Sequence, residues 1–147
     1  MNKEEIANLL DKNHSAFIDF IDDLNLDEFL VSNHGKWTPG QQLEHILLSV
    51  RPVRLVLSLP KFLLKFLWGK ANRDSRTYDE LVKKYQNKLK SGGQASGRFI
   101  PKKVAFKKKQ YVIDKLKKEI VLLRAKLDRF SEEELEFYVI PLEFDTV

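Results

Sequence analysis

Few side chains in this sequence could carry out chemistry, and His45 is the best placed of them. The chain has no cysteine, which removes disulfides, thiolate catalysis and cysteine-based zinc sites together. Its 3 histidines are His14, His34 and His45. An imidazole can transfer protons or bind a metal ion near neutral pH, but both roles need further groups that converge on it. The chemistry expected of this chain therefore centres on His45.

A well-defined helix start positions His45. Thr38 is a typical N-cap residue, Pro39 suits the first helical position, and Gln41 completes a capping-box pattern. At 100° per residue, one side of this helix collects large apolar residues, while a second side collects Gln41, His45 and Ser49. Leucines flank this second side, so we expect it to be half-buried and able to line a pocket. On periodicity alone, a histidine buried for ordinary hydrogen bonding is the commoner case.

The residues around His45 resemble a known signature. The stretch from Lys36 to Val50, KWTPGQQLEHILLSV, is similar to the tryptophan-to-histidine signature of the DinB-like superfamily. Later stretches resemble one bacterial branch of that superfamily in the same order, namely PKFLLKFLWGKANRDSRTYDELVKKY, GGQASGRFIPKK and FSEEELEFYVIPL. The resemblance extends from the first residues of the chain to residue 142.

This resemblance implies an up-and-down four-helix bundle, with a divalent metal held by one His on the second helix and two on the last long helix. Characterised relatives include thiol-dependent transferases and isomerases. His45 matches the first ligand, and we expect Trp37, Gln41 and Ser49 to line the pocket beside it. After Pro141 the chain reads LEFDTV, where the family pattern would continue into the last helix and its His pair. We therefore expect nickel or zinc to bind this chain weakly or not at all, because the metal site is incomplete.

Length and composition fit one helical domain, residues 1–147. A chain of 147 residues suits a single core, and 43% hydrophobic residues with only 6 Gly and 5 Pro favour an all-α protein. The N-terminal residues lack a signal-peptide pattern, and no apolar run reaches the about 18 residues that a membrane span needs. We expect a cytoplasmic protein that does not act at a membrane.

Charge is segregated along the chain, whose formal net charge is +5. Both ends are acidic and the middle is basic, above all residues 98–118. No recognised nucleic-acid-binding motif accompanies that basic stretch, so we expect a solvated or ion-paired face and no nucleic-acid partner. A helix is expected to begin at Lys107, Lys108 and Lys109, although positive charge is unfavourable at a helix N-terminus. An acidic or anionic group should therefore offset these lysines.

Hydrophobic spacing predicts five helical segments and a short turn after Ser131. The expected helices are 3–24, 38–57, a short helix after Pro60, 77–90, and one from residue 104 or 107 to 130. In the short helix, four apolar residues oppose Lys61 and Lys65, which favours a lid over the core rather than a helix in a membrane surface. Those four residues are Phe62, Leu63, Phe66 and Leu67. In 77–90 the expected inner face is Tyr78, Leu81, Val82, Tyr85 and Leu89.

Two functions follow from these patterns. The first depends on the resemblance: a metal-dependent, thiol-dependent transferase-type protein for a small molecule, with an incomplete metal site, so that enzymatic activity stays open. The second is a non-catalytic helical interaction module, in which a bundle with a truncated or missing last helix leaves an apolar groove for a partner or a second copy. Three long apolar-faced segments need a fourth wall, which predicts a homodimer or larger homo-oligomer.

Overall fold

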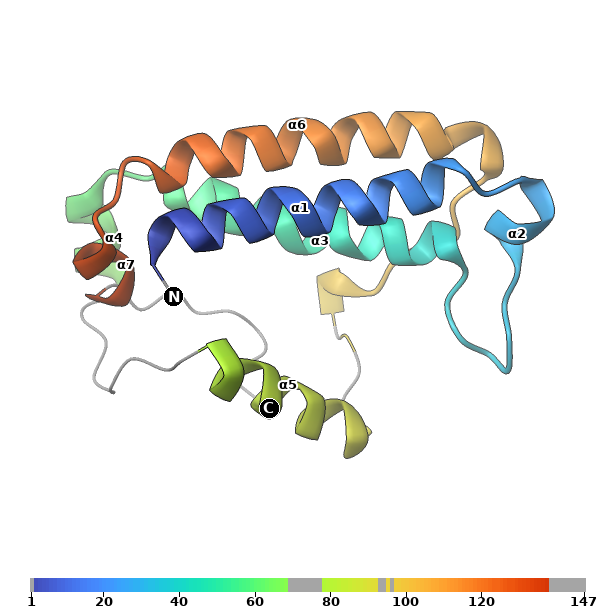
Figure 1. Ribbon diagram of the computed structural model, residues 1–147, viewed down its shortest axis with the longest axis horizontal. Helices are drawn as coiled ribbons and strands as arrows, with labels where there is room; N and C mark the ends of the chain where they lie inside the picture. Colours follow the sequence, from blue (N-terminus) through green and yellow to red (C-terminus); the bar gives the residue numbers. More distant parts are fainter. Residues whose placement is uncertain (1, 69–77, 93–94, 96, 138–147) are drawn as a thin grey trace.

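Every regular element in the described part of this protein is helical, as Figure 1 shows for the computed structural model. The structure describes residues 2–68, 78–92, 95 and 97–137. The long helices are α1 (Lys3–Asp22), α3 (Pro39–Leu57) and α6 (Lys109–Leu127). The shorter ones are α2 (Leu26–Leu30), α4 (Lys61–Trp68), α5 (Tyr78–Lys90), α7 (Glu132–Phe137) and the 3-10 helices η1 (Gly97–Phe99) and η2 (Phe106–Lys108). The all-α prediction is confirmed for these residues.

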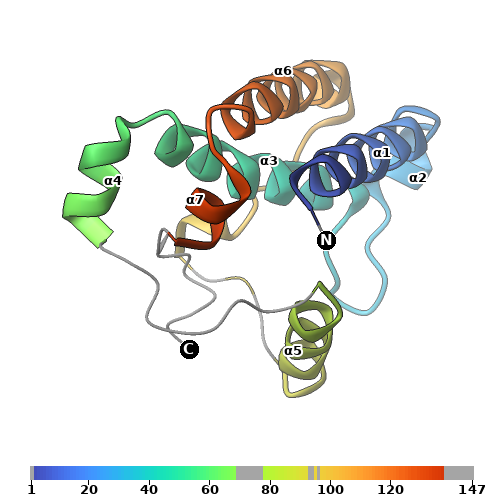
Figure 2. The ribbon, with the colours of Figure 1, turned by 60° about the vertical axis from the view of Figure 1, so that its left-hand side comes forward.

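The three long helices form the centre of the molecule. Helix α6 packs along α3 and along α1, whereas α1 and α3 meet only over a short stretch. Helix α5 lies apart from these three in both ribbon views (Figures 1 and 2). No helix in the described ranges has the length and apolar character needed to cross a membrane.

One hydrophobic core lies between the long helices. Leu43 of α3 and Ile113 and Leu116 of α6 are fully buried, and Phe29 of α2 closes one end of the core. The buried residues of α6 follow one side of the helix, at steps of three or four positions apart from one adjacent pair. They are Val112, Ile113, Leu116, Ile120, Leu123 and Leu127. Tyr111, directly before this series, is 58% exposed.

Local capping determines where several helices begin. The Thr38 hydroxyl accepts the Gln41 amide at 3.1 Å, and the Gln41 side chain accepts the Thr38 amide at 3.1 Å, which confirms the predicted capping box. The predicted cap at Ser131 is confirmed in the same way. Helix α2 is not among the helices that the sequence predicted, and Asn25 caps it. Its side chain accepts the Glu28 amide at 2.9 Å.

Helix α4 forms where it was predicted, but its buried side differs from the expected one. Leu64 is 1% exposed and makes the contact with the core, whereas Phe62 and Phe66 are 76% and 83% exposed. The expected stripe therefore does not face the core. The prediction placed the buried stripe opposite Lys61 and Lys65. An eight-residue helix is too short for periodicity to identify the buried side.

The inner face predicted for residues 77–90 is wrong at two positions. Tyr85 and Leu89 of α5 are 51% and 52% exposed, so this side of α5 is not buried against the long helices. The expected helix start at Thr77 and the side chains of Tyr78 and Leu81 lie outside the described residues. Helix α5 therefore does not supply a fully packed fourth wall.

Backbone oxygens help to offset the lysines at the start of α6. Lys109 Nζ donates to the carbonyl oxygens of Asp22 at 2.7 Å and Leu24 at 3.1 Å, at the C-terminal end of α1. Helix C-termini carry partial negative charge, so the first helix supplies the expected anionic group through its backbone. Elsewhere the acidic ends meet the basic middle directly. Lys61 of α4 pairs with Glu134 of α7 at 2.8 Å.

Candidate functional site

His45 holds the segment around η1 against α3. Its Nδ1 lies 2.9 Å from the carbonyl oxygen of Phe99, a residue 54 positions later in the chain. A carbonyl oxygen only accepts, so in the neutral ring Nδ1 carries the proton and Nε2 keeps its lone pair. The Trp37 ring lies against the imidazole, with 5.0 Å between ring centroids and a tilt of 49°. His45 is therefore half-buried between Trp37 and the backbone of η1.

The two polar residues expected beside His45 make backbone contacts. Gln41 Nε2 donates to the Pro101 carbonyl at 3.4 Å, in addition to its capping bond. Ser49 Oγ donates to the His45 carbonyl at 2.8 Å, within α3 itself. Both side chains are thus satisfied by the backbone, and Gln41 and His45 together hold residues 99–101 on one side of α3.

An open pocket of about 250 Å³ has Trp37 in its lining. Helix α1 contributes Phe17, Phe20 and Ile21 to its lining. The connection between α2 and α3 contributes Val31, Asn33, Lys36 and Trp37, and the first turn of α3 contributes Pro39 and Gln42. Of the residues expected in a pocket, Trp37 belongs to this lining, whereas Gln41, Ser49 and His45 do not.

The metal ligands available among the described residues do not fit a catalytic site. Catalytic zinc takes three protein ligands, usually with a water in the fourth position. Within residues 2–68, 78–92, 95 and 97–137, no three His, Cys, Asp or Glu side chains converge in a way that could hold a metal ion. His14 Nδ1 bonds to the Leu10 carbonyl at 2.8 Å on α1, and His34 lies in the exposed turn before α3. Among the described residues, His45 thus stands as a single candidate ligand.

The opposite end of the molecule carries a second candidate site, an exposed aromatic surface on α4. Phe62, Phe66 and Leu67 are 76%, 83% and 51% exposed, next to the exposed ammonium of Lys65. Helix α7 lies beside α4 in Figure 2, and the Lys61–Glu134 pair joins the two helices. This pair lowers the pKa of Glu134, mainly through the hydrogen bond from Lys61.

Sequence reasoning missed both sites in part. The phenylalanines of α4 were expected to cover the core. The available signal that they face outward was the composition of this short helix, which is unusually apolar and carries two lysines. The pocket collects residues from α1, from a connection and from α3, so no local spacing could reveal it. Comparison with known proteins adds no further assignment, because no protein-family model, curated protein or solved structure matches the chain.

Proposed function

We propose that this chain is a non-catalytic helical interaction module that self-associates through the α4–α7 surface. This surface is defined as Phe62, Lys65, Phe66 and Leu67 of α4 with Glu133 of α7. The observation that carries the proposal is the exposure of the two phenylalanines, because soluble monomers rarely leave neighbouring large aromatic side chains open to water.

The geometry of α4 supports an interface role for these rings. Phe62 and Phe66 are four positions apart and lie on one side of the helix, while Leu64 anchors the helix to the core with 1% exposure. The rings are therefore presented on an anchored element. Burying four such rings in a dimer contributes about 6–12 kcal/mol. Association costs about 4–15 kcal/mol, so we expect a weak dimer.

Charge favours a second copy as the occupant of this surface. Helix α4 is basic, with Lys61 and Lys65, and the first turn of the neighbouring α7 is acidic, with Glu132, Glu133 and Glu134. Lys65 and Glu133 are exposed and make no ion pair within the described residues. A two-fold axis between two copies brings the basic part of one surface onto the acidic part of the other. The same surface can thus complement itself in charge and in apolar character.

Sedimentation velocity of the full chain across the micromolar range tests the proposal. We expect the mean mass to rise with concentration from the 17.2 kDa monomer toward the dimer. The double variant Phe62→Ser/Phe66→Ser should remain a monomer. Val121→Ser on α6 is the matched control, because Val121 is also an exposed apolar residue, at 69%, and lies outside the surface.

A charge exchange tests the two-fold arrangement separately. Lys65→Glu should weaken the dimer by placing acidic groups against each other, and adding Glu133→Lys should restore it. Wild-type protein that stays monomeric, or a phenylalanine variant that associates as well as wild type, would overturn the proposal. Circular dichroism of each variant checks that the helices are retained.

A second candidate is the DinB-like bundle with a metal-dependent transferase-type activity. The orientation of His45 supports it, because metal-binding histidines usually donate their other ring N–H to a backbone carbonyl or carboxylate, as Nδ1 does to Phe99. This function requires two more ligands, from a partner chain or from Glu143 and Asp145, which lie outside the described residues. It ranks second because the described residues supply only one ligand.

A further inference from the structure

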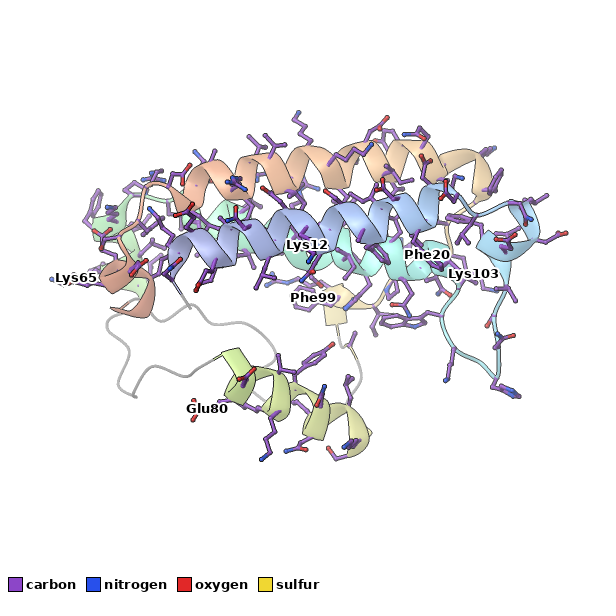
Figure 3. All side chains as sticks on the ribbon, viewed as in Figure 1. Lys12, Phe20, Lys65, Glu80, Phe99 and Lys103 are labelled. Atoms are coloured by element: carbon purple, nitrogen blue, oxygen red, sulfur yellow. The ribbon has the colours of Figure 1, made fainter. Side chains whose placement is uncertain are left out.

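We propose that the pocket between α1 and the start of α3 binds a small planar aromatic acid. This inference is independent of self-association, since the two sites lie at opposite ends of the molecule. Figure 3 shows Phe20 near the right-hand end of α1 and Lys65 at the far left, on α4.

The walls of the pocket suit a flat apolar ring. Phe17, Phe20 and Trp37 supply three aromatic side chains from two separate segments, and Ile21, at 1% exposure, joins the pocket to the core. The Trp37 ring also contacts the His45 ring, which is itself bonded to the Phe99 carbonyl. Aromatic rings favour offset or edge-to-face contact with another ring, so these side chains suit a planar aromatic ligand.

Polar side chains at the rim of the pocket are available to bind the acidic group of a ligand. Asn33, Lys36 and Gln42 line the pocket, and their side chains make no hydrogen bond or ion pair within the described residues. Apolar pockets with a few convergent polar groups are typical small-molecule sites, because the polar groups set orientation and specificity. Here the unpaired ammonium of Lys36 suits a carboxylate.

The lining is positive overall. Lys36 is its one charged residue, and the pocket lies at the N-terminal end of α3, which carries partial positive charge. The nearby acids of α1 point away: at 100° per residue, Asp19 and Asp22 lie about 140–200° around the helix from Phe17. An anion therefore meets attraction at this rim, without a carboxylate among the lining residues to oppose it.

Volume limits the size of the ligand. The pocket holds about 250 Å³, below the roughly 300–1,000 Å³ of sites for drug-sized molecules. It is also open, so part of a ligand stays in contact with water. One or two fused rings with a single acidic group match this space, which makes 2-naphthoate a suitable probe.

The test is an NMR titration of the ¹⁵N-labelled full chain with 2-naphthoate and with neutral 2-naphthamide. We expect naphthoate to shift amide signals of residues 17–21 and 31–42, and to bind more tightly than naphthamide. Lys36→Gln should weaken the binding of naphthoate about two- to fivefold, as for the loss of an exposed ion pair, and leave the binding of naphthamide unchanged. Phe20→Ser should weaken both probes, because it removes a ring from the wall.

Lys12→Gln is the matched control, since Lys12 is an exposed lysine on α1 outside the pocket lining. Spectra without probe establish that each variant keeps the wild-type fold. The proposal is overturned if neither probe binds at millimolar concentration, or if the shifts concentrate on α4. Equal affinity for the two probes, or equal weakening by Lys12→Gln and Lys36→Gln, would overturn the assignment of an acidic ligand.

Discussion

Arg54 of α3 holds Glu119 of α6 through two parallel hydrogen bonds. The Nε–Oε2 distance is 2.7 Å and the Nη2–Oε1 distance is 2.9 Å. The two side chains are only 18% and 13% exposed, on the two helices that pack most extensively. The hydrogen bond raises the pKa of Arg54 and lowers the pKa of Glu119, while burial opposes both shifts. The pair therefore joins α3 to α6 in a fixed register.

Removing one partner of this pair should destabilise the protein. We expect Arg54→Met to lower the free energy of unfolding by about 1–3 kcal/mol, because it leaves the Glu119 carboxylate shielded from water without its donor. Replacing both, as Arg54→Met/Glu119→Leu, should cost less than the sum of Arg54→Met and Glu119→Leu. Urea denaturation of the wild type and the three variants measures the coupling, and additive losses would show that the pair contributes nothing specific.

The same pair predicts a dependence on pH. Because folding lowers the pKa of Glu119 below its ordinary value of 4.5, the stabilisation is fully present above that pH. It is lost as the pH falls below about 4.5 through the folded-state pKa. The stability difference between wild type and Glu119→Gln should therefore shrink on acidification. A difference that stays constant from pH 7 to about pH 3 would contradict this origin.

Gly40 is required by a close approach between α3 and its neighbours. A Cβ atom there would lie 2.8 Å from the Phe29 ring and 3.2 Å from Val104. Phe29 is fully buried and cannot move aside easily. We expect Gly40→Ala to destabilise the protein by about 1–3 kcal/mol in thermal or urea unfolding, although alanine is the better helix former.

A smaller neighbour should relieve that clash. In the background of Phe29→Leu, the added methyl group of Gly40→Ala should cost less than in the wild type, because the ring atoms it meets are gone. The control is an exposed helical position: Ser15→Ala on α1, which should change stability by no more than about 0.5 kcal/mol. If Gly40→Ala destabilised both backgrounds equally, contact with the Phe29 ring would not be the cause of its effect.

Metal binding by the purified chain should be weak or absent. His45 is one ligand, and imidazole sites reach useful affinity only when several donors converge. Elemental analysis after dialysis against Ni²⁺ or Zn²⁺ should find well under one metal ion per chain. Near-stoichiometric metal that disappears in His45→Ala would contradict this expectation and would favour the transferase-type function. His14→Ala is the matched control, because His14 bonds within α1.

Local sequence determined where α3 and α7 begin. The capping residues Thr38 and Gln41, like Ser131 and Glu134, are three positions apart and bond within one turn. Such contacts depend only on neighbouring residues, so they can be predicted without knowing the fold. The buried side of α6 was predictable for a related reason, because nineteen residues give several turns over which apolar spacing repeats.

Tertiary structure decided what the functional candidates contact. His45 was identified from the sequence, but its partner Phe99 is 54 positions away, and that bond depends on how the chain returns to α3. The exposed side of α4 was decided by Leu64, since a short helix can dock on the core by either side. The pocket at Trp37 exists only because α1 and the start of α3 meet around one connection. Local periodicity specifies which surfaces each helix can present, whereas packing between distant segments selects which of them are buried and which stay open to a ligand or a second copy.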